Sequence, residues 1–146
     1  MIQNEKEYND LFDALLPFGQ QMLNNHGEFL PYAAVVGPEG AVALVAGDIG
    51  EECPDPTRLF DFLIAALRKQ VQAEGCRAAG VCVNVSVVDP RNGQKGDAVR
   101  FVYEHRSGEA FEIYVPYRKR FLRGYQFEKP FAKAGEPQVF RSLEKA

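Results

Sequence analysis

The sequence predicts an α+β fold in which an antiparallel sheet of about five strands packs against two main helices. Two long segments, 4–26 and 55–74, carry apolar residues at helical spacing. Five shorter segments carry the alternating or continuous apolar pattern of β-strands. Short turns join neighbouring strands, and such turns favour antiparallel pairing. The expected order of elements is αββαβββ, a sandwich of helices and sheet.

The first helical segment carries signals for its start and its end. Asn4 can cap the helix, and Glu7 lies three residues later, as in a capping box. Pro17 removes one backbone donor, so it should kink the helix or split it in two. Gly27 can adopt the left-handed conformation that ends a helix. The apolar stripe expected to face the sheet is Tyr8, Leu11, Phe12, Leu15, Leu16, Met22 and Leu23.

A strand hairpin and a second helix follow. Segments 31–36 and 41–46 are short and apolar, and the Gly-Pro-Glu-Gly sequence between them is typical of a turn. Asp55 can cap the second helix, with Pro56 at its first position. Its expected core face is Phe60, Leu63, Ile64, Leu67 and Val71. Further apolar residues surround nearly the whole helix, so these should face the first helix or another chain: Leu59, Phe62 and Ala66.

Three strands complete the predicted sheet, at 77–89, 97–106 and 110–117. Pro cannot donate a hydrogen bond within a central strand, so Pro116 and the stretch 119–125 should end the sheet. The chain is then expected to turn onto the surface, where a short helix can form around 118–124. We expect residues 119–146 to be an irregular C-terminal extension.

Composition indicates a globular protein with a single domain, residues 1–146. The chain has 46% hydrophobic and 25% charged residues, which excludes disordered, collagen-like and coiled-coil classes. No apolar run approaches the roughly 20 residues of a membrane span, and no signal peptide is visible. Three cysteines, Cys53, Cys76 and Cys82, suit a reducing compartment better than a disulfide framework. We therefore expect a cytoplasmic protein without a membrane partner.

Charge is distributed unevenly along the chain. Residues 1–75 hold 4 basic and 12 acidic residues, whereas residues 76–146 hold 13 and 8. Such asymmetry can mark a binding surface, although two halves of opposite charge that pack together explain it more simply. The most unusual stretch interleaves aromatics with four cations, Arg118, Lys119, Arg120 and Arg123. Because the pI is near 5.4, this basic patch favours a protein partner over nucleic acid.

Two resemblances accompany this outline. The hairpin at 32–42, with its hydrophobic strand and its turn of Gly and Glu, resembles the first hairpin of roadblock domains. The order of elements resembles the roadblock/longin/profilin-like group, which implies a five-stranded antiparallel sheet between helices. Segments 26–34, 97–100, and 104–106 through to 116–118 are similar to small bacterial proteins of unassigned function. That second resemblance supports the domain outline and implies no activity.

A few residues could take part in catalysis or metal binding. His26 and Glu28 lie where the first helix ends, and Glu104 and His105 are adjacent on a predicted strand. Two histidines with two carboxylates could bind a metal or transfer protons. Their spacing matches no ligand motif, so we expect no metal and no cofactor. Cys53 precedes a helix N-terminus, which can lower a thiol pKa, but no histidine is its neighbour in the sequence.

These observations favour a non-catalytic protein-binding or regulatory module that acts on a partner protein or as a homodimer. One alternative is an immunity-like antagonist whose acidic segment 48–61 meets a basic partner. The other is a small enzyme with a pocket formed by His26, Glu28 and His105, with Tyr32 or Tyr103. A pocket that brings both histidines together would favour the enzyme, whereas a flat apolar or acidic patch would favour binding.

Overall fold

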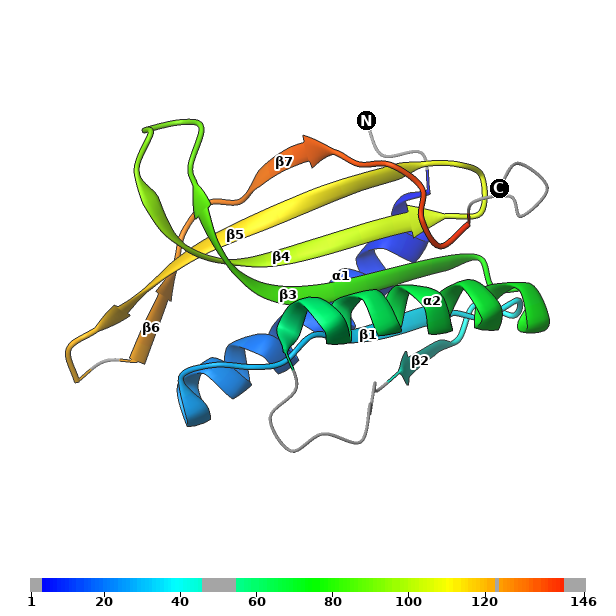
Figure 1. The fold of residues 1–146 in the computed structure, drawn as a ribbon, viewed down its shortest axis with the longest axis horizontal. Coiled ribbons are helices and arrows are strands. Elements are labelled where there is room, and N and C mark those ends of the chain that lie inside the picture. Colours follow the sequence, from blue (N-terminus) through cyan, green and yellow to red (C-terminus); the bar gives the residue numbers. More distant parts are fainter. Residues whose placement is uncertain (1–3, 46–54, 123, 141–146) are drawn as a thin grey trace.

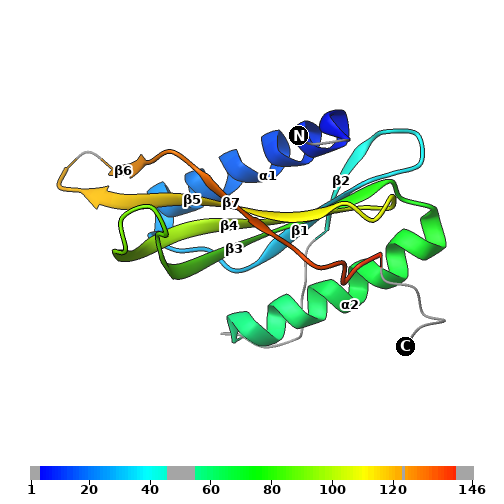
Figure 2. The same cartoon turned by 90° about the horizontal axis from the view of Figure 1, so that it is seen from above.

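The computed structural model describes residues 4–45, 55–122 and 124–140. It confirms the α+β class: two helices lie on opposite faces of an antiparallel sheet (Figure 1, Figure 2). Seven strands form within the described ranges, rather than about five. The elements are α1 (Glu5–His26), β1 (Tyr32–Val36), β2 (Val42–Val45), α2 (Pro56–Glu74), β3 (Ala78–Val88), β4 (Lys95–His105), β5 (Ala110–Arg120), β6 (Gly124–Phe127) and β7 (Phe131–Ala134).

The two unexpected strands lie within 119–146, where an irregular extension was predicted. The sheet order is β2-β1-β3-β4-β5-β6, and β7 pairs with another part of β5. β5 continues past Arg118, and Arg120 pairs with Gly124. The predicted end of the sheet at 119–125 and the short helix at 118–124 are therefore wrong. The basic residues 118–120 extend a strand that already pairs with β4, and β6 folds back antiparallel beside them.

Pro116 is tolerated in β5 because of the direction in which its backbone faces. It lies opposite Ala98 of β4. Its carbonyl accepts a hydrogen bond from Glu128 N–H at 2.8 Å, on the other side of β5. The N–H and C=O of one strand residue face the same neighbour. The missing donor of Pro116 therefore faces the connection between β6 and β7, and no hydrogen bond to β4 is lost.

Helix α1 covers one face of the sheet. Its apolar side packs on a core that includes Val99, Phe101 and Tyr103 of β4. α1 continues as one helix through Pro17, so the predicted split is wrong, and the predicted kink stays a prediction. Packing against the sheet outweighs the roughly 3 kcal/mol that an interior proline costs. A tyrosine fixes the middle of the helix to the sheet, because Tyr32 of β1 donates its hydroxyl to the Leu15 carbonyl.

Helix α2 covers the opposite face, beside β1 and β3, and Asp55 caps it through Thr57 N–H as predicted. The chain after β7 crosses to the same side of the sheet as α2 (Figure 2). Val139 is buried there among the α2 side chains. Arg68 of α2 donates to the Gln138 carbonyl at 2.9 Å. This second layer is therefore built from one helix and a segment close to the C-terminus.

Candidate binding hairpin

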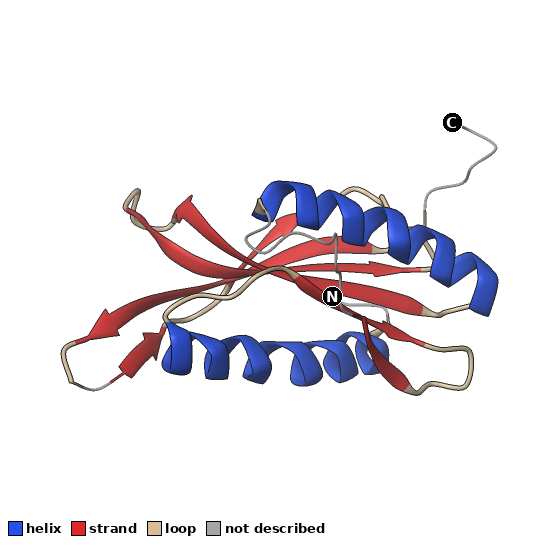
Figure 3. Cartoon of the chain, turned by 60° about the horizontal axis from the view of Figure 1, so that its bottom comes forward, coloured by secondary structure: helices blue, strands red, loops and turns tan. Residues whose placement is uncertain are grey.

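The β5–β6 hairpin projects beyond both helices at one end of the molecule (Figure 1, Figure 3). Residues 117–120 pair with residues 124–127, so strand pairing continues close to the tip. At the tip, Phe121 is 88% exposed and Leu122 is 89% exposed. These are the two most exposed large apolar side chains of the described residues. We call residues 117–127 the basic hairpin.

The base of the basic hairpin is fixed to the core. The ring of Tyr117 contacts those of Tyr125 and Phe127, with centroids 5.6 Å and 5.9 Å away. The last turn of α1 lies close by: a Cβ on Gly27 would lie 3.4 Å from the Tyr125 hydroxyl. The Tyr117 hydroxyl donates to Asn84 Oδ1 of β3 at 2.5 Å. The exposed tip is therefore carried by a well-anchored base.

The tip has an unfavourable backbone conformation. Leu122 has φ of 62°, the one positive φ of a non-glycine residue in the described ranges. A side chain in this left-handed region costs roughly 1–2 kcal/mol, and glycine avoids that cost. Residues held in such conformations cluster at functional sites. The combination of strain and exposure makes the tip the best candidate for a binding element.

Charged and polar side chains surround the tip. Arg118 forms an ion pair with Glu128 at 2.8 Å. Arg120 donates to the Gln126 side chain at 2.6 Å. Lys119, which is exposed, has no ion-pair partner in the described part of the chain. The fourth predicted cation, Arg123, lies outside the described residues. One cation of the basic patch, Arg118, is therefore neutralised by Glu128, the residue that directly follows the basic hairpin.

The residues of the predicted enzyme pocket lie apart. His26 and Glu28 are exposed near the C-terminal end of α1. His105 lies beside the N-terminal end of α1. There the β4–β5 turn, which follows His105, meets the helix, and Asn4 N–H donates to the Glu109 side chain. Because an α-helix rises 1.5 Å per residue, the two histidines are separated by about 30 Å along α1. No pocket can contain them both.

His105 is buried in a structural setting. Its Nδ1 accepts the Ser107 N–H at 3.0 Å, so the proton of the neutral ring is on Nε2. Nε2 has no hydrogen-bond partner among the described residues and lies 3.7 Å from a Glu7 carboxylate oxygen. This arrangement orients the β4–β5 turn against the first turn of α1.

The hydroxyl groups of the two candidate tyrosines already donate hydrogen bonds within the protein. Tyr32 donates to Leu15 O, and Tyr103 donates to Asn4 O at 3.4 Å. Burial raises the pKa of both phenols well above the usual value. Neutral phenols that already donate to backbone carbonyls are poorly suited to proton transfer.

Glu104 points away from His105, because neighbouring residues of a strand face opposite sides of the sheet. Its buried carboxylate accepts N–H groups of three successive residues: Gln138 at 2.9 Å, Val139 at 2.8 Å and Phe140 at 3.2 Å. It therefore fixes the C-terminal segment in place and cannot join His105 in a metal site. The residues that the structure describes contain no group of three His, Cys, Asp or Glu side chains suited to a metal.

The predicted interface on α2 is incomplete. Leu59 is buried and faces the sheet, so its assignment to an outer face is wrong. Phe62 is exposed and Ala66 is half-buried. The helix is therefore amphipathic rather than apolar nearly all round. Leu59 is positioned by helical geometry, one turn before Leu63 on the core side.

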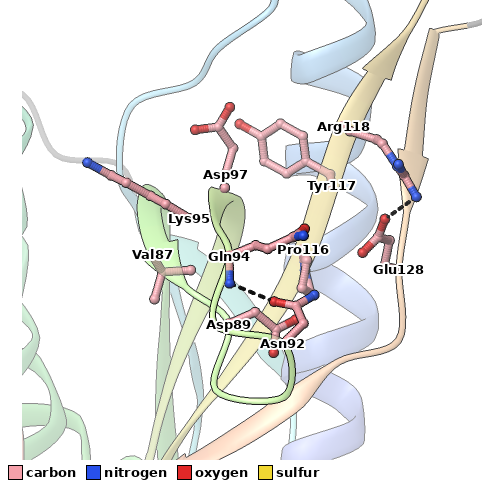
Figure 4. A pocket seen from close by; sticks show the side chains of 11 residues that line it. Val87, Asp89, Asn92, Gln94, Lys95, Asp97, Pro116, Tyr117, Arg118 and Glu128 are labelled. Carbon is pink, nitrogen blue, oxygen red and sulfur yellow. Dashed lines mark hydrogen bonds and ion pairs between the residues drawn. The ribbon is translucent and has the colours of Figure 1, made fainter.

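Two hollows in the described surface offer little for catalysis. The first, of about 160 Å³, lies between the β3–β4 turn and strands β5 and β6 (Figure 4). It is smaller than the roughly 300–1,000 Å³ of typical small-molecule sites. Some of its polar groups already have partners: Arg118 binds Glu128, and Gln94 N–H donates to Asn92.

The second hollow, of about 370 Å³, lies beneath the start of α2. Its cation, Arg100, donates to Glu112 and lies 5.3 Å from the centroid of the Phe60 ring. Its charge is thus already compensated within the protein.

The remaining features that the sequence analysis named are the cysteines and the acidic stretch. Cys53 and the acidic stretch 48–54 lie outside the described residues. Cys76 and Cys82 are free and buried. Neither described helix is long and apolar enough to cross a membrane.

Comparisons with protein-family models, with curated proteins and with solved structures found no match.

Sequence reasoning found the basic stretch but missed its most exposed part, the apolar tip. The signal was present, because Phe121 and Leu122 follow three cations without a polar residue between them. It also missed the role of Glu104. A carboxylate that binds backbone N–H groups 34 to 36 residues away leaves no local pattern in the sequence.

Proposed function

We propose that this protein is a non-catalytic protein-binding module whose docking element is the basic hairpin. The observation that carries the proposal is the tip, where Phe121 and Leu122 are almost fully exposed on a well-anchored base. Aromatic and arginine side chains that enter a partner's pocket commonly dominate binding energy. A fixed base lowers the entropy lost on binding. The expected partner offers an apolar pocket with an acidic rim.

A protein partner suits the charge better than a phosphate-rich surface. The chain has a net charge of −3, and two hairpin cations are engaged with Glu128 and Gln126. Binding to nucleic acid or to anionic lipid draws on many unpaired cations. A few cations around two apolar side chains are better suited to a shaped pocket, where electrostatics guides the encounter and apolar burial supplies affinity.

The other functional predictions made from the sequence differ in how well they are supported. Separation of His26 from His105 removes the reason for the enzyme alternative. The immunity-like alternative depends largely on residues 48–54 and stays a prediction. The likeness to roadblock, longin and profilin domains also stays a prediction, and it fits a regulatory module. A cytoplasmic setting is part of the proposal, since Cys76 and Cys82 are free thiols.

The test begins by replacing Phe121 with a photo-crosslinking amino acid and identifying the proteins attached in the native host. Affinity of each purified candidate is then measured for wild type and for Phe121→Ser/Leu122→Ser. We expect the double variant to lose at least about tenfold in affinity, since one buried apolar anchor is worth about 1.4 kcal/mol or more. Lys119→Glu should slow association, and this effect should fade at high salt.

Val88→Ser is the matched control, because Val88 is an exposed apolar residue elsewhere on the sheet. It should bind like wild type. Equal affinity of wild type and the tip variant for every crosslinked protein would contradict the proposal. So would tip-dependent binding of the purified protein to anionic vesicles or to nucleic acid, with no protein partner required.

A further inference from the structure

Strand β2 forms the lateral edge of the sheet opposite to the basic hairpin (Figure 1). Its register with β1 shows which of its backbone groups face away from β1. Gly37 N–H donates to Ala41 O, so residue 41 faces β1, and so do residues 43 and 45 by alternation. The N–H and C=O groups of Val42 and Leu44 therefore point outward, away from β1.

This edge lacks the features that usually prevent strand pairing. Natural edge strands are protected by charged side chains, proline or bulges. β2 reads Val-Ala-Leu-Val and pairs with β1 in unbroken register, so its short length is the one protective feature that residues 42–45 themselves carry. Leu44 is 67% exposed and Val42 is 37% exposed. Both lie on the α1 side of the sheet, because they oppose Ala34 and Val36 of the α1-side core.

We infer that the β2 edge pairs with the β2 edge of a second copy, so that two sheets join into one. This inference is independent of the function proposed for the hairpin. A twofold axis at Ala43 places Val42 of one chain opposite Leu44 of the other, twice. Each such pair exchanges two backbone hydrogen bonds. The outward groups of both strands are then satisfied by each other.

A second copy is the occupant that this strand fits best. Directly opposed residues share a face of the sheet, so Val42 and Leu44 of both chains form one apolar cluster on the α1 side. β2 carries no charge, so antiparallel self-pairing brings no like charges together. The paired strands are short, so the interface is small. We therefore expect a weak dimer whose formation depends on concentration.

The geometry gives a specific crosslinking test. In the dimer, Ala43 of each chain forms a non-hydrogen-bonded pair with its copy, where Cα atoms are about 4.5 Å apart. That distance allows a disulfide. Under mild oxidation, Ala43→Cys should form a covalent dimer much faster than Phe62→Cys, which places a cysteine on exposed α2. Wild type serves as the control for the native cysteines.

A second measurement avoids introduced cysteines. Sedimentation of wild type from micromolar to millimolar concentrations should reveal a dimer. Leu44→Lys should remain monomeric and folded, because its side chain is exposed, whereas Phe62→Asp should dimerise like wild type. A monomeric wild type at millimolar concentration would overturn the inference. Equal crosslinking of the two cysteine variants, or unchanged dimerisation of Leu44→Lys, would also overturn it.

Discussion

The two lateral edges of the sheet are built differently. Beyond β5, the chain adds β6, β7 and the segment that Glu104 of β4 holds in place beside α2. Arg91 of the β3–β4 turn donates to the Lys129 carbonyl at 2.7 Å, which ties a further loop to this side. Among the described residues, the β2 edge has one neighbouring strand, β1, and its sequence is uncharged and apolar.

The two edges therefore differ in whether the outer strand is covered by further parts of the same chain. On the β5 side, the chain covers its own strand and then sends out a basic hairpin with an apolar tip. On the β2 side, backbone groups of Val42 and Leu44 remain directed outward. A covered edge contributes to the stability of the single chain, whereas an open edge contributes little until it is paired. The predictions below test this contrast, from the largest expected effect to the smallest.

Glu104→Ala should be the most damaging change. It leaves three backbone N–H groups without their carboxylate acceptor, so we expect a loss of about 3 kcal/mol in the free energy of unfolding. Urea unfolding measures this loss, and hydrogen exchange should show faster exchange at residues 138–140. Glu5→Ala, at an exposed helix position, is the control. A loss no larger than that of the control would show that the β5 side does not depend on this anchor.

Alkaline pH should cause the second-largest loss in the free energy of unfolding, through Tyr117 on the β5 side. Burial raises the pKa of Tyr117 to about 12, from the usual 10.0. Between these values the unfolded chain loses the phenol proton and the folded chain keeps it. The free energy of unfolding should therefore fall as pH rises from about 10 to about 12, with no contribution from this group below 10.

Tyr117→Phe is the variant that isolates this effect. Its stability should depend less steeply on pH over the same interval than that of wild type, as followed by thermal unfolding at a series of pH values. Tyr32 and Tyr103, whose pKa values are also raised by burial, supply the pH dependence that remains. An identical slope in the two proteins would contradict the assignment to Tyr117.

Leu122→Gly should increase stability, because glycine adopts a positive φ without steric cost. We expect a gain of about 1 kcal/mol in the free energy of unfolding, measured in urea. The same change should weaken binding to the hairpin's partner, since it removes one tip side chain. Phe121→Gly is the matched control and should not increase stability. A stabilised Phe121→Gly would indicate that strain at Leu122 is not the cause.

Leu44→Ser should have the smallest effect on the single chain. The side chain is mostly exposed, so a change within about 0.5 kcal/mol is expected at concentrations where the protein is monomeric. Urea unfolding at low protein concentration measures it. A loss comparable with that of Glu104→Ala would mean that the β2 edge is already part of the monomer core, contrary to the contrast drawn between the edges.

The sequence alone determined the elements whose signals are local. The bounds of α1 and α2 follow from apolar spacing, from the cap at Asp55 and from the glycines that end each helix, Gly27 and Gly75. The alternating patterns of 77–89, 97–106 and 110–117 correctly marked β3, β4 and β5. These signals are readable because helix and strand periodicity depend on residues within a few positions of one another.

Tertiary structure decided what depends on distant partners. β6 and β7 are short, and each becomes a strand because β5 offers it unpaired backbone groups. Pro116 is harmless only because of the side that its amide faces, and Leu59 is buried only because of how α2 is rotated on the sheet. The separation of His26 from His105 is likewise set by the length of α1 and its path across the sheet. In each case the deciding contact joins residues far apart in the chain, which local periodicity cannot encode.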